Sequence, residues 1–356
     1  MSDNNAPGGP LRALVTAAAV IIVVAGLDAA ADVLLPLLLS GFLSIIALPV
    51  VRGLRRAGLP NVVAILIVVF AVAGLLVLFT AIVATTVGRF TSALPRYEPQ
   101  LEELMTLGLA QLEQLGISTD AQNLSDLLEP TYIMVVVGQT VNALAAVVSR
   151  LLIVTVTMTF MLLEAQELAV KLKVAFGEED GPGGALGQVS EKVQRYLLIK
   201  TLVSIATGVL AGTWVWALGL DFPVLWGLLA FLLNYIPSIG SIVAAVPPVL
   251  LAMVQLGPGY AVAVALGYAV VNVTLGNFLE PRFLGRSLGL SPLVIFLSLL
   301  FWGWVWGPVG MLFCVPMTVI AKVVLESQED TLWLAVLLGS SADVAEYRTA
   351  RGAAPV

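Results

Sequence analysis

The stretch FPVLWGLLAFLLNYIPSIGSIVAAVPPVLLAMVQLGPGYAVAVALGYAVVNVTLGNFL, residues 222–279, decides the fold because its 58 consecutive residues include no Asp, Glu, Lys or Arg. A helix needs only about 20 residues to cross a hydrocarbon core about 30 Å thick, so this run must enter the membrane more than once. Pro237, Gly240, Pro247 and Pro248 interrupt it. Such breaks free backbone groups that lipid cannot satisfy, and they persist where they are buried in protein or line a water-filled cavity. We therefore expect function near these breaks.

The composition places the whole chain in the membrane class. Of its 356 residues, 59% are hydrophobic and 11% are charged, with a mean hydropathy of +1.01, whereas soluble domains carry about 25% charged residues. The chain has no His and a single Cys, Cys314, which excludes the usual zinc sites, histidine proton relays and disulfide frameworks. We expect no metal, no cofactor and no nucleic-acid partner. An enzyme is the least favoured class, because no nucleophile and base pair is visible.

Charge divides the chain into regions on opposite sides of the membrane. Residues 89–130 carry seven acids and two arginines, whereas basic residues gather at 52–56 and at 171–200. Because short cytoplasmic loops are rich in Lys and Arg, the acidic segment is expected outside and the basic segments inside. The predicted segments are an N-terminal three-helix membrane scaffold (1–88), an acidic amphipathic extracytoplasmic helical domain (89–130), a membrane helix leading to a cytoplasmic loop (131–175), a Gly-rich loop (176–187), two transport repeats (188–256 and 257–325) and a cytoplasmic tail (326–356).

The N-terminal scaffold is expected to begin with a helix over 11–27, a tight acidic turn at Asp28 and Asp32, and a second helix over 33–51. A third follows in the uncharged run 62–88. The first apolar segment also has the length of a signal peptide, but the residues before it carry no net positive charge. A retained first helix is therefore favoured.

One further feature lies within the outer domain and another follows it. Apolar residues in 101–115 repeat with helical spacing, and this stripe lies either on the membrane interface or against another subunit. Packing is favoured, because interfacial helices are usually rich in Lys and Arg. Arg150 belongs to a membrane helix expected over 144–164, where it either snorkels outward or pairs with a carboxylate.

After residue 188 the chain repeats one broken unit. A helix over 190–219 precedes the interrupted apolar run 223–254, and a helix over 260–279 precedes the interrupted run 291–322. Each run has 32 residues, which as a straight helix would measure about 48 Å. Neither run fits the membrane as one upright span.

The prolines of the two runs have the same spacing. Pro223 and Pro247 are 24 positions apart, as are Pro292 and Pro316. Weak internal symmetry of this kind is typical of transporter folds.

Each run is either a re-entrant hairpin or a strongly kinked crossing. With hairpins, 14 of the 17 Lys and Arg residues lie inside, and with full crossings 12 do, so the charge rule favours hairpins. The predicted fold is an all-α polytopic membrane protein with about eight hydrophobic elements. It contains an acidic extracytoplasmic helical insertion and two inverted helix-plus-re-entrant-hairpin repeats, whose tips meet near mid-membrane. Both termini are expected in the cytoplasm.

Several motifs of the second half have a familiar order and spacing. They are NYIPSIG at 234–240, NFLEPR at 277–282 with Gly285, LSPL at 290–293, WG at 302–303 with Gly307 and Gly310, and VP at 315–316. In these motifs, which cover most of residues 190–325, the chain resembles the autoinducer-2 exporter (AI-2E) family of bacterial membrane transporters. Its structural positions here are Pro223, Pro247, Pro281, Gly285, Pro292 and Pro316.

The resemblance implies that a homo-oligomer transports a small molecule or ion through the lipid bilayer of the bacterial inner membrane. Some members of this family export the quorum-sensing signal autoinducer-2, and sodium or lithium exchange for protons is claimed for others. The motifs do not carry the identity of the solute.

The first break supplies candidate solute ligands. Pro237 and Gly240 leave backbone carbonyls and amides unpaired, which either hold a polar solute or belong to a plain structural kink. Asn234, Ser238 and Ser241 flank the break with polar side chains, which either line the pathway or join helices together.

Glu280 ends the long uncharged run. Asn277 precedes it by three positions, which would place both on one face of an α-helix. The carboxylate either binds a proton or cation or forms an interfacial ion pair with Arg282 or Arg286. Lys200 is expected to be a cytoplasmic anchor.

The second break repeats the first, with Gly307, Pro308 and Gly310 as pathway candidates. Three tryptophans precede it: Trp302, Trp304 and Trp306. They form either an aromatic belt at the interface or part of the pathway lining.

The sequence thus predicts a permease or exporter that works by alternating access at a mid-membrane site. One alternative is a cation/proton antiporter in which Glu280 titrates. Another is a non-transporting membrane scaffold that recruits partners through residues 89–130.

Overall fold

The computed structural model describes residues 9–97, 99–100, 106, 151–176, 185–237, 239–284, 289–326 and 331–340, which form helices and turns without strands. The helices are α1 (Gly9–Ala29), α2 (Ala31–Arg56), α3 (Asn61–Ala93), η1 (Leu94–Arg96), α7 (Leu151–Phe176), α8 (Ala185–Ala217), α9 (Pro223–Leu233), α10 (Gly240–Leu256), α11 (Pro258–Asn272), η3 (Val273–Leu279), α12 (Glu280–Leu284), α13 (Pro292–Glu326) and α14 (Leu332–Leu338).

Five of the described helical segments are long and apolar enough to cross a membrane. They are Ala31–Arg56, Asn61–Ala93, Glu191–Ala217, Pro258–Phe283 and Pro292–Glu326. Large apolar side chains cover their outer surfaces; Phe70 on α3, for example, is 73% exposed. Apolar surface on this scale is unstable in water but matches a bilayer. The predicted all-α polytopic membrane class is confirmed.

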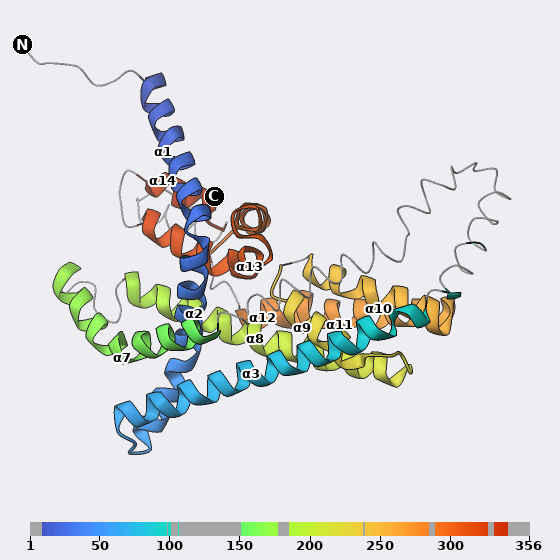
Figure 1. Cartoon of the computed structure of the whole chain (residues 1–356). Helices are drawn as coiled ribbons and strands as arrows, with labels where there is room; N and C mark the ends of the chain where they lie inside the picture. The colour runs from blue at the N-terminus through green and yellow to red at the C-terminus, as the bar shows by residue number, and fades with distance from the viewer. Residues whose placement is uncertain are drawn as a thin grey trace, which may run out of the picture.

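The turn expected at Asp28 and Asp32 does not reverse the chain. Ala30 is the one residue between α1 and α2, and helical hydrogen bonds flank it, from Ala30 N to Gly26 O and from Leu34 N to Ala30 O. Figure 1 shows the two helices running end to end. The sequence here lacks a helix breaker, since aspartate is tolerated near helix ends, where it adds polarity without stopping the helix.

The first broken run folds back on itself as the first hairpin, defined here as residues 223–256. Residues 234–239 separate its arms, α9 and α10. At its base, the backbone N–H of Asp221 donates to Gln255 Oε1 at 3.0 Å. Because residues at opposite ends of the run touch, the chain enters and leaves on the same side. A kinked full crossing is excluded.

The second broken run is also a hairpin, the second hairpin, defined as residues 292–326. Ser298 Oγ donates to Cys314 O at 2.9 Å, and Trp302 Nε1 donates to Thr318 Oγ1 at 3.2 Å. Residues 16 apart on a straight helix would be separated by about 24 Å. The reversal occurs at Gly307, whose φ of 61° and ψ of −147° lie outside helical space in a region that favours glycine.

A buried lysine joins the ends of the second hairpin. Lys322 is 6% exposed, and its Nζ donates to the carbonyl of Gly289 at 2.7 Å. Glu326, one turn further along α13, lies 3.4 Å from the same ammonium group. Each hairpin therefore has a polar bond across its base and a break at its tip.

The base of the first hairpin is fixed to the end of α3. The Tyr97 hydroxyl donates to the Asp221 carboxylate, and burial together with this hydrogen bond raises the pKa of Tyr97 above its usual value. Phe222 has a φ of 60°, unusual for a residue with a side chain. Its ring packs edge-on against Phe90, which also contacts Trp226. These contacts hold the strained entry into α9.

Helix α8 connects the two halves of the core. Ala211 and Val215, near its C-terminal end, belong to a cluster with α3, α9, α10 and α11. Tyr196 and Leu197 belong to a second cluster with α2, α13 and Leu290. Figure 1 shows α8 passing beside α9 and α11. The first hairpin therefore packs around the C-terminal part of α8, and the second hairpin packs around its N-terminal part.

Several predicted features fall outside the described residues. These are the amphipathic helix over 101–115 apart from Thr106, Arg150, most of the Gly-rich loop (177–184) and most of the tail (341–356). The domain boundaries stay predictions.

Two glycines at the tips allow the hairpins to close. A Cβ at Gly240 would lie 1.8 Å from Leu233 O, and one at Gly310 would lie 1.9 Å from Trp302 O. Both atoms are backbone and cannot give way. We expect Gly240→Ala and Gly310→Ala each to lower the free energy of unfolding by about 4 kcal/mol, measured by thermal or chemical denaturation in detergent.

The matched control is Gly74→Ala on α3, where an added Cβ meets nothing within 4 Å. Because alanine is the better helix former, this change is neutral or stabilises by up to about 1 kcal/mol. Equal stability of the Gly240→Ala and Gly74→Ala variants would contradict the tight packing of the first tip.

Candidate functional site

The tip of the first hairpin lies against the middle of α8. Asn234, 5% exposed, donates from Nδ2 to Ser204 Oγ at 2.9 Å. The next residue, Tyr235, donates from its hydroxyl to Thr201 Oγ1 at 2.8 Å. Both acceptors lie within one turn of α8. The break at residues 234–239 is therefore joined to α8 by two side-chain hydrogen bonds.

Lys200, next to Thr201 and one turn before Ser204 on α8, belongs to a buried ion pair. Lys200 Nζ lies 2.7 Å from Glu280 Oε1 and 2.9 Å from Oε2, and the two side chains are 5% and 14% exposed. Taking two charges out of water is costly, and only close pairing offsets the cost. Ionisable residues within membrane segments are usually functional for this reason. The pair joins α8 of the first unit to the end of the helix that opens the second.

The chain changes its winding just before Glu280. Residues Val273–Leu279 form a π-helix between α11 and α12, a geometry that is rare and often found at functional sites. Because it does not follow α-helical spacing, Asn277 and Glu280 do not share a face: Asn277 is exposed, whereas Glu280 points to Lys200. The shared face expected from their spacing is therefore wrong.

Buried side chains from both units surround the ion pair. Tyr196, one turn before Lys200, is 4% exposed. Cys314 of the second hairpin is fully buried and belongs to the same cluster as Tyr196. At the helix ends, Arg195 Nη2 donates to Phe283 O at 3.2 Å from an exposed position. The pair thus lies between the first hairpin tip, α8 and the second hairpin.

Hydroxyl groups hold the arms of the second hairpin together. The Ser298 and Thr318 hydroxyls lie against each other, and each is within hydrogen-bond distance of Cys314 O, so their two protons are shared among these three contacts. Because membrane helices gain little from apolar contact alone, bonds of this kind contribute to keeping them together. The second hairpin is therefore expected to act as one body.

The second tip has a different neighbour from the first. Trp306 Nε1 donates to Leu27 O at 3.0 Å, which ties this tip to the end of α1. Ile236 of the first tip packs in the same apolar cluster as Trp302 and Trp306. Among the described residues, however, the hydrogen bonds of the two tips go to different helices, and they do not form one polar site. The predicted meeting of the tips is thus limited to apolar packing.

The predicted pathway residues differ in their surroundings. Asn234 and Glu280 bind residues that lie one turn apart on α8, Ser204 and Lys200, and Gly240 is buried where the first tip closes. Pro237 and Ser241 are half-buried beside them. Asn277 and Pro308 are exposed, Gly307 is half-buried and Gly310 is buried in the second tip, and Ser238 lies outside the described residues.

The predicted structural positions take the places expected of prolines. Pro223 and Pro292 begin their helices, and Pro247 and Pro316 lie inside the returning arms. Pro281 is exposed in α12, and Gly285 lies outside the described residues.

Sequence reasoning missed Lys200, which is not the exposed anchor it was expected to be. Glu280 pairs with it, not with Arg282. A signal was present in the sequence: Tyr196, Lys200, Val203 and Thr207 follow one another at helical spacing, and all four are buried. A lysine within the buried stripe of a membrane helix needs a partner of opposite charge.

The three tryptophans do not form one belt. Trp302 and Trp306 are 8% and 7% exposed, and their rings lie 4.7 Å apart between the arms and α1. Trp304 is 76% exposed and is the one that faces outward. The aromatic-belt interpretation is thus wrong for Trp302 and Trp306, which are buried, and stays a prediction for Trp304.

The ion pair gives a test of coupling across the two units. We expect Lys200→Met or Glu280→Gln to lower the free energy of unfolding by about 3–5 kcal/mol, because each leaves an unpaired polar partner buried. The double variant should recover most of this loss. A double-mutant cycle from denaturation in detergent measures the coupling.

An exposed ion pair serves as the control. Lys171 on α7 pairs with Glu164 and Glu167, and all three side chains are at least half exposed. Lys171→Met should leave stability unchanged within error. If the two single changes at Lys200 and Glu280 add without coupling, the buried pair has no energetic role.

Comparisons with known proteins agree with this architecture. The pattern described as AI-2E family transporter matches residues 14–329. The chain is 36% identical over 328 residues to the AI-2 transport protein TqsA of Escherichia coli, covering 92% of this chain and 95% of that protein. It is 35% identical to a putative transport protein of Haemophilus influenzae, over 93% and 97% of the two chains, and 33% identical to the putative transport protein YhhT of Escherichia coli, over 92% and 94%. The chain belongs to the AI-2E family of membrane transporters.

Proposed function

We propose that the chain moves a small polar solute across the membrane by alternating access, with the solute site where the first hairpin tip meets α8. The observation that carries this proposal is the Lys200–Glu280 pair, held within one turn of the Asn234–Ser204 contact. Broken helices with charged groups at membrane depth are the usual setting of transporter sites.

The geometry supports a specific movement. Two side-chain hydrogen bonds join the first tip to α8, from Asn234 to Ser204 and from Tyr235 to Thr201. Hydrogen bonds between membrane helices contribute about 0.6 kcal/mol each on average, so these two can break during a transport cycle. When the first tip moves away from α8, the polar side chains beside Lys200 become accessible to a solute.

The solute we propose is autoinducer-2, moved outward. TqsA is named as an AI-2 transport protein, and its similarity extends over nearly the whole chain. A site with one ammonium, one carboxylate, an amide and hydroxyls is suited to a small molecule rich in oxygen, which both donates and accepts hydrogen bonds. We also propose that the chain acts as a homo-oligomer in the bacterial inner membrane, with both termini in the cytoplasm.

Transport by the charge-free double variant separates the solute site from stability. Lys200→Met/Glu280→Gln keeps the fold but removes both charges, and we expect it to move autoinducer-2 into proteoliposomes at least about tenfold more slowly than the native chain. Asn234→Ala should show a similar loss. The assay follows the amount of solute retained in the vesicles with time.

The matched control is Glu191→Gln, which makes the same chemical change at an exposed position of α8. It should transport at the native rate. Normal transport by the folded double variant would place the solute site elsewhere.

Exchange of sodium for protons is a second candidate function, favoured by the same ion pair. In this exchange the Glu280 carboxylate would bind either a proton or a sodium ion, so that binding of sodium releases the proton, because one carboxylate cannot hold both at once. We expect sodium to change the internal pH of vesicles that contain the native chain and not of vesicles with the double variant. No pH change with the native chain would remove this candidate and leave solute export unaffected.

The scaffold alternative depends on residues 89–130, most of which lie outside the described residues.

A further inference from the structure

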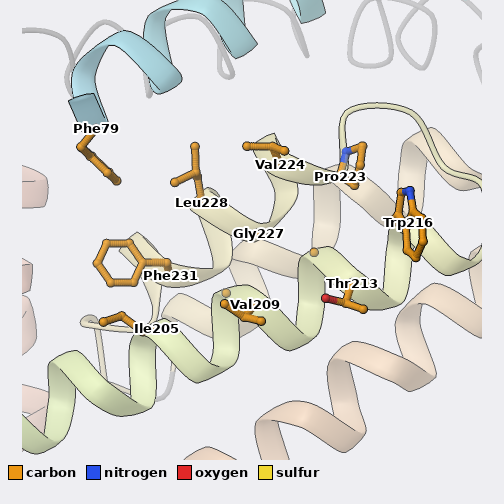
Figure 2. Close-up of a pocket in the computed structure, with 12 residues that line it drawn as sticks. Phe79, Ile205, Val209, Thr213, Trp216, Pro223, Val224, Gly227, Leu228 and Phe231 are labelled. Atoms are coloured by element: carbon orange, nitrogen blue, oxygen red, sulfur yellow. The ribbon is translucent and has the colours of Figure 1, made fainter. Parts of the chain in front are cut away.

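A groove extends along α8 from Ile205, beside the first hairpin tip, to Trp216 near the C-terminal end of the helix. Its volume is about 540 Å³, and it is lined by α3, α8 and α9. Figure 2 shows Phe79 of α3 above it, Val209 and Thr213 of α8 below, and Leu228 of α9 between them. We propose that this groove binds one acyl chain of a membrane lipid, which lies along the seam between α8 and the first hairpin.

The chemistry of the lining favours an acyl chain. No charged side chain is among the residues that line the groove, and Thr213 and the Trp216 indole are its polar side chains. A polar solute or a lipid headgroup would lose its hydrogen bonds with water there without replacement. A hydrocarbon chain has no such bonds to lose.

The groove is continuous with the surface that faces the bilayer. Val209 and Val224 are 61% and 55% exposed on their helices, and both line the groove. Helix α8 belongs to a segment long and apolar enough to cross the membrane. Lipid hydrocarbon is therefore the medium at the mouth of the groove. An acyl chain enters the groove from this bilayer-facing surface.

The length of the groove matches one leaflet. From Ile205 to Trp216, α8 rises about 16 Å at 1.5 Å per residue, close to half of a hydrocarbon core about 30 Å thick. At one end Trp216 is 69% exposed, as expected for an indole near the headgroups. At the other end Phe231 packs between Phe79 and Tyr235, with ring centroids 6.1 and 5.8 Å away.

The glycines of the seam are not available to a helix from another copy. Gly208 and Gly212 face Gly227 of α9, and a Cβ at Gly208 would lie 2.7 Å from Gly227 O. Small residues at this spacing usually let two helices approach closely, and here they already do so within the chain. The groove thus lies beside an existing contact between α8 and α9.

A bound acyl chain would touch both α3 and α9. Phe79 belongs to α3, while Val224, Leu228 and Phe231 belong to the first arm of the first hairpin. The position of the lipid has a consequence that rests on the proposed function. If the first hairpin moves during transport, the lipid lies between the moving hairpin and α3. The binding itself does not depend on transport.

Photo-labelling tests the proposal. The native chain is reconstituted in phosphatidylethanolamine vesicles that contain a phosphatidylethanolamine with a diazirine at mid-chain, and labelled peptides are identified by mass spectrometry. We expect labelling to concentrate in residues 205–231. Val209→Trp, which fills the groove, and Val209→Asp, which makes it polar, should each reduce this labelling about tenfold.

The matched controls are Val262→Trp and Val262→Asp on α11, where the native side chain is 59% exposed and does not line the groove. They should label as the native chain does. Because positions 209 and 262 are both exposed, the four variants are expected to fold, which size-exclusion chromatography checks.

Three results would overturn the proposal. Labelling of residues 205–231 at the same level as the exposed face of α11 would indicate ordinary surrounding lipid. A disulfide between two copies of a Val209→Cys variant would show that a second copy covers the groove. Cross-linking of the same cysteine to residues 107–150 of its own chain would show that this segment fills it. None of these results bears on solute transport through the Lys200 site.

Discussion

The rest of the structure depends on one electrostatic constraint, the pairing of Lys200 with Glu280 out of water. Either charge alone would destabilise the membrane-embedded core, so α8 and the end of the η3 helix must stay together. The first hairpin returns along α8 and places Asn234 one turn from the pair. Cys314 of the second hairpin packs in the same buried cluster as Tyr196, which lies one turn before Lys200. The two repeated units are thus joined by a buried ion pair between α8 and the end of η3.

Much of the fold follows from composition and spacing. Uncharged runs too long for one crossing, with prolines at equal spacing, predict two hairpins, and contacts such as Asp221 with Gln255 confirm that the chain doubles back. Breakers are local signals with a direct effect on the backbone, and this is why they are reliable. The prediction of a turn at Asp28 and Asp32 is wrong because aspartate is not a breaker. It adds polarity but does not prevent a helix.

The candidate site was only partly predictable. Glu280 and Asn234 stand out as polar residues at the edges of apolar runs, but the partner of Glu280 lies 80 residues away. The charge rule assigns lysines to the cytoplasmic surface, and it therefore misplaces one that is paired inside the protein. Asn277 fails for a local reason, since the η3 segment is a π-helix and the spacing of three residues no longer places it beside Glu280. Periodicity identifies a face only where the helix type is known.

The short arms of the first hairpin have a consequence for how the protein is made. Helix α9 has 11 residues and is about 16 Å long, too short for a nascent chain to leave the translocon as a span of its own. Lys200 emerges from the ribosome long before Glu280, so its ammonium waits without its carboxylate while the hairpin and α11 are synthesised. The buried pair can therefore form only after residue 280 has been synthesised, when the hairpin between its two residues is already present.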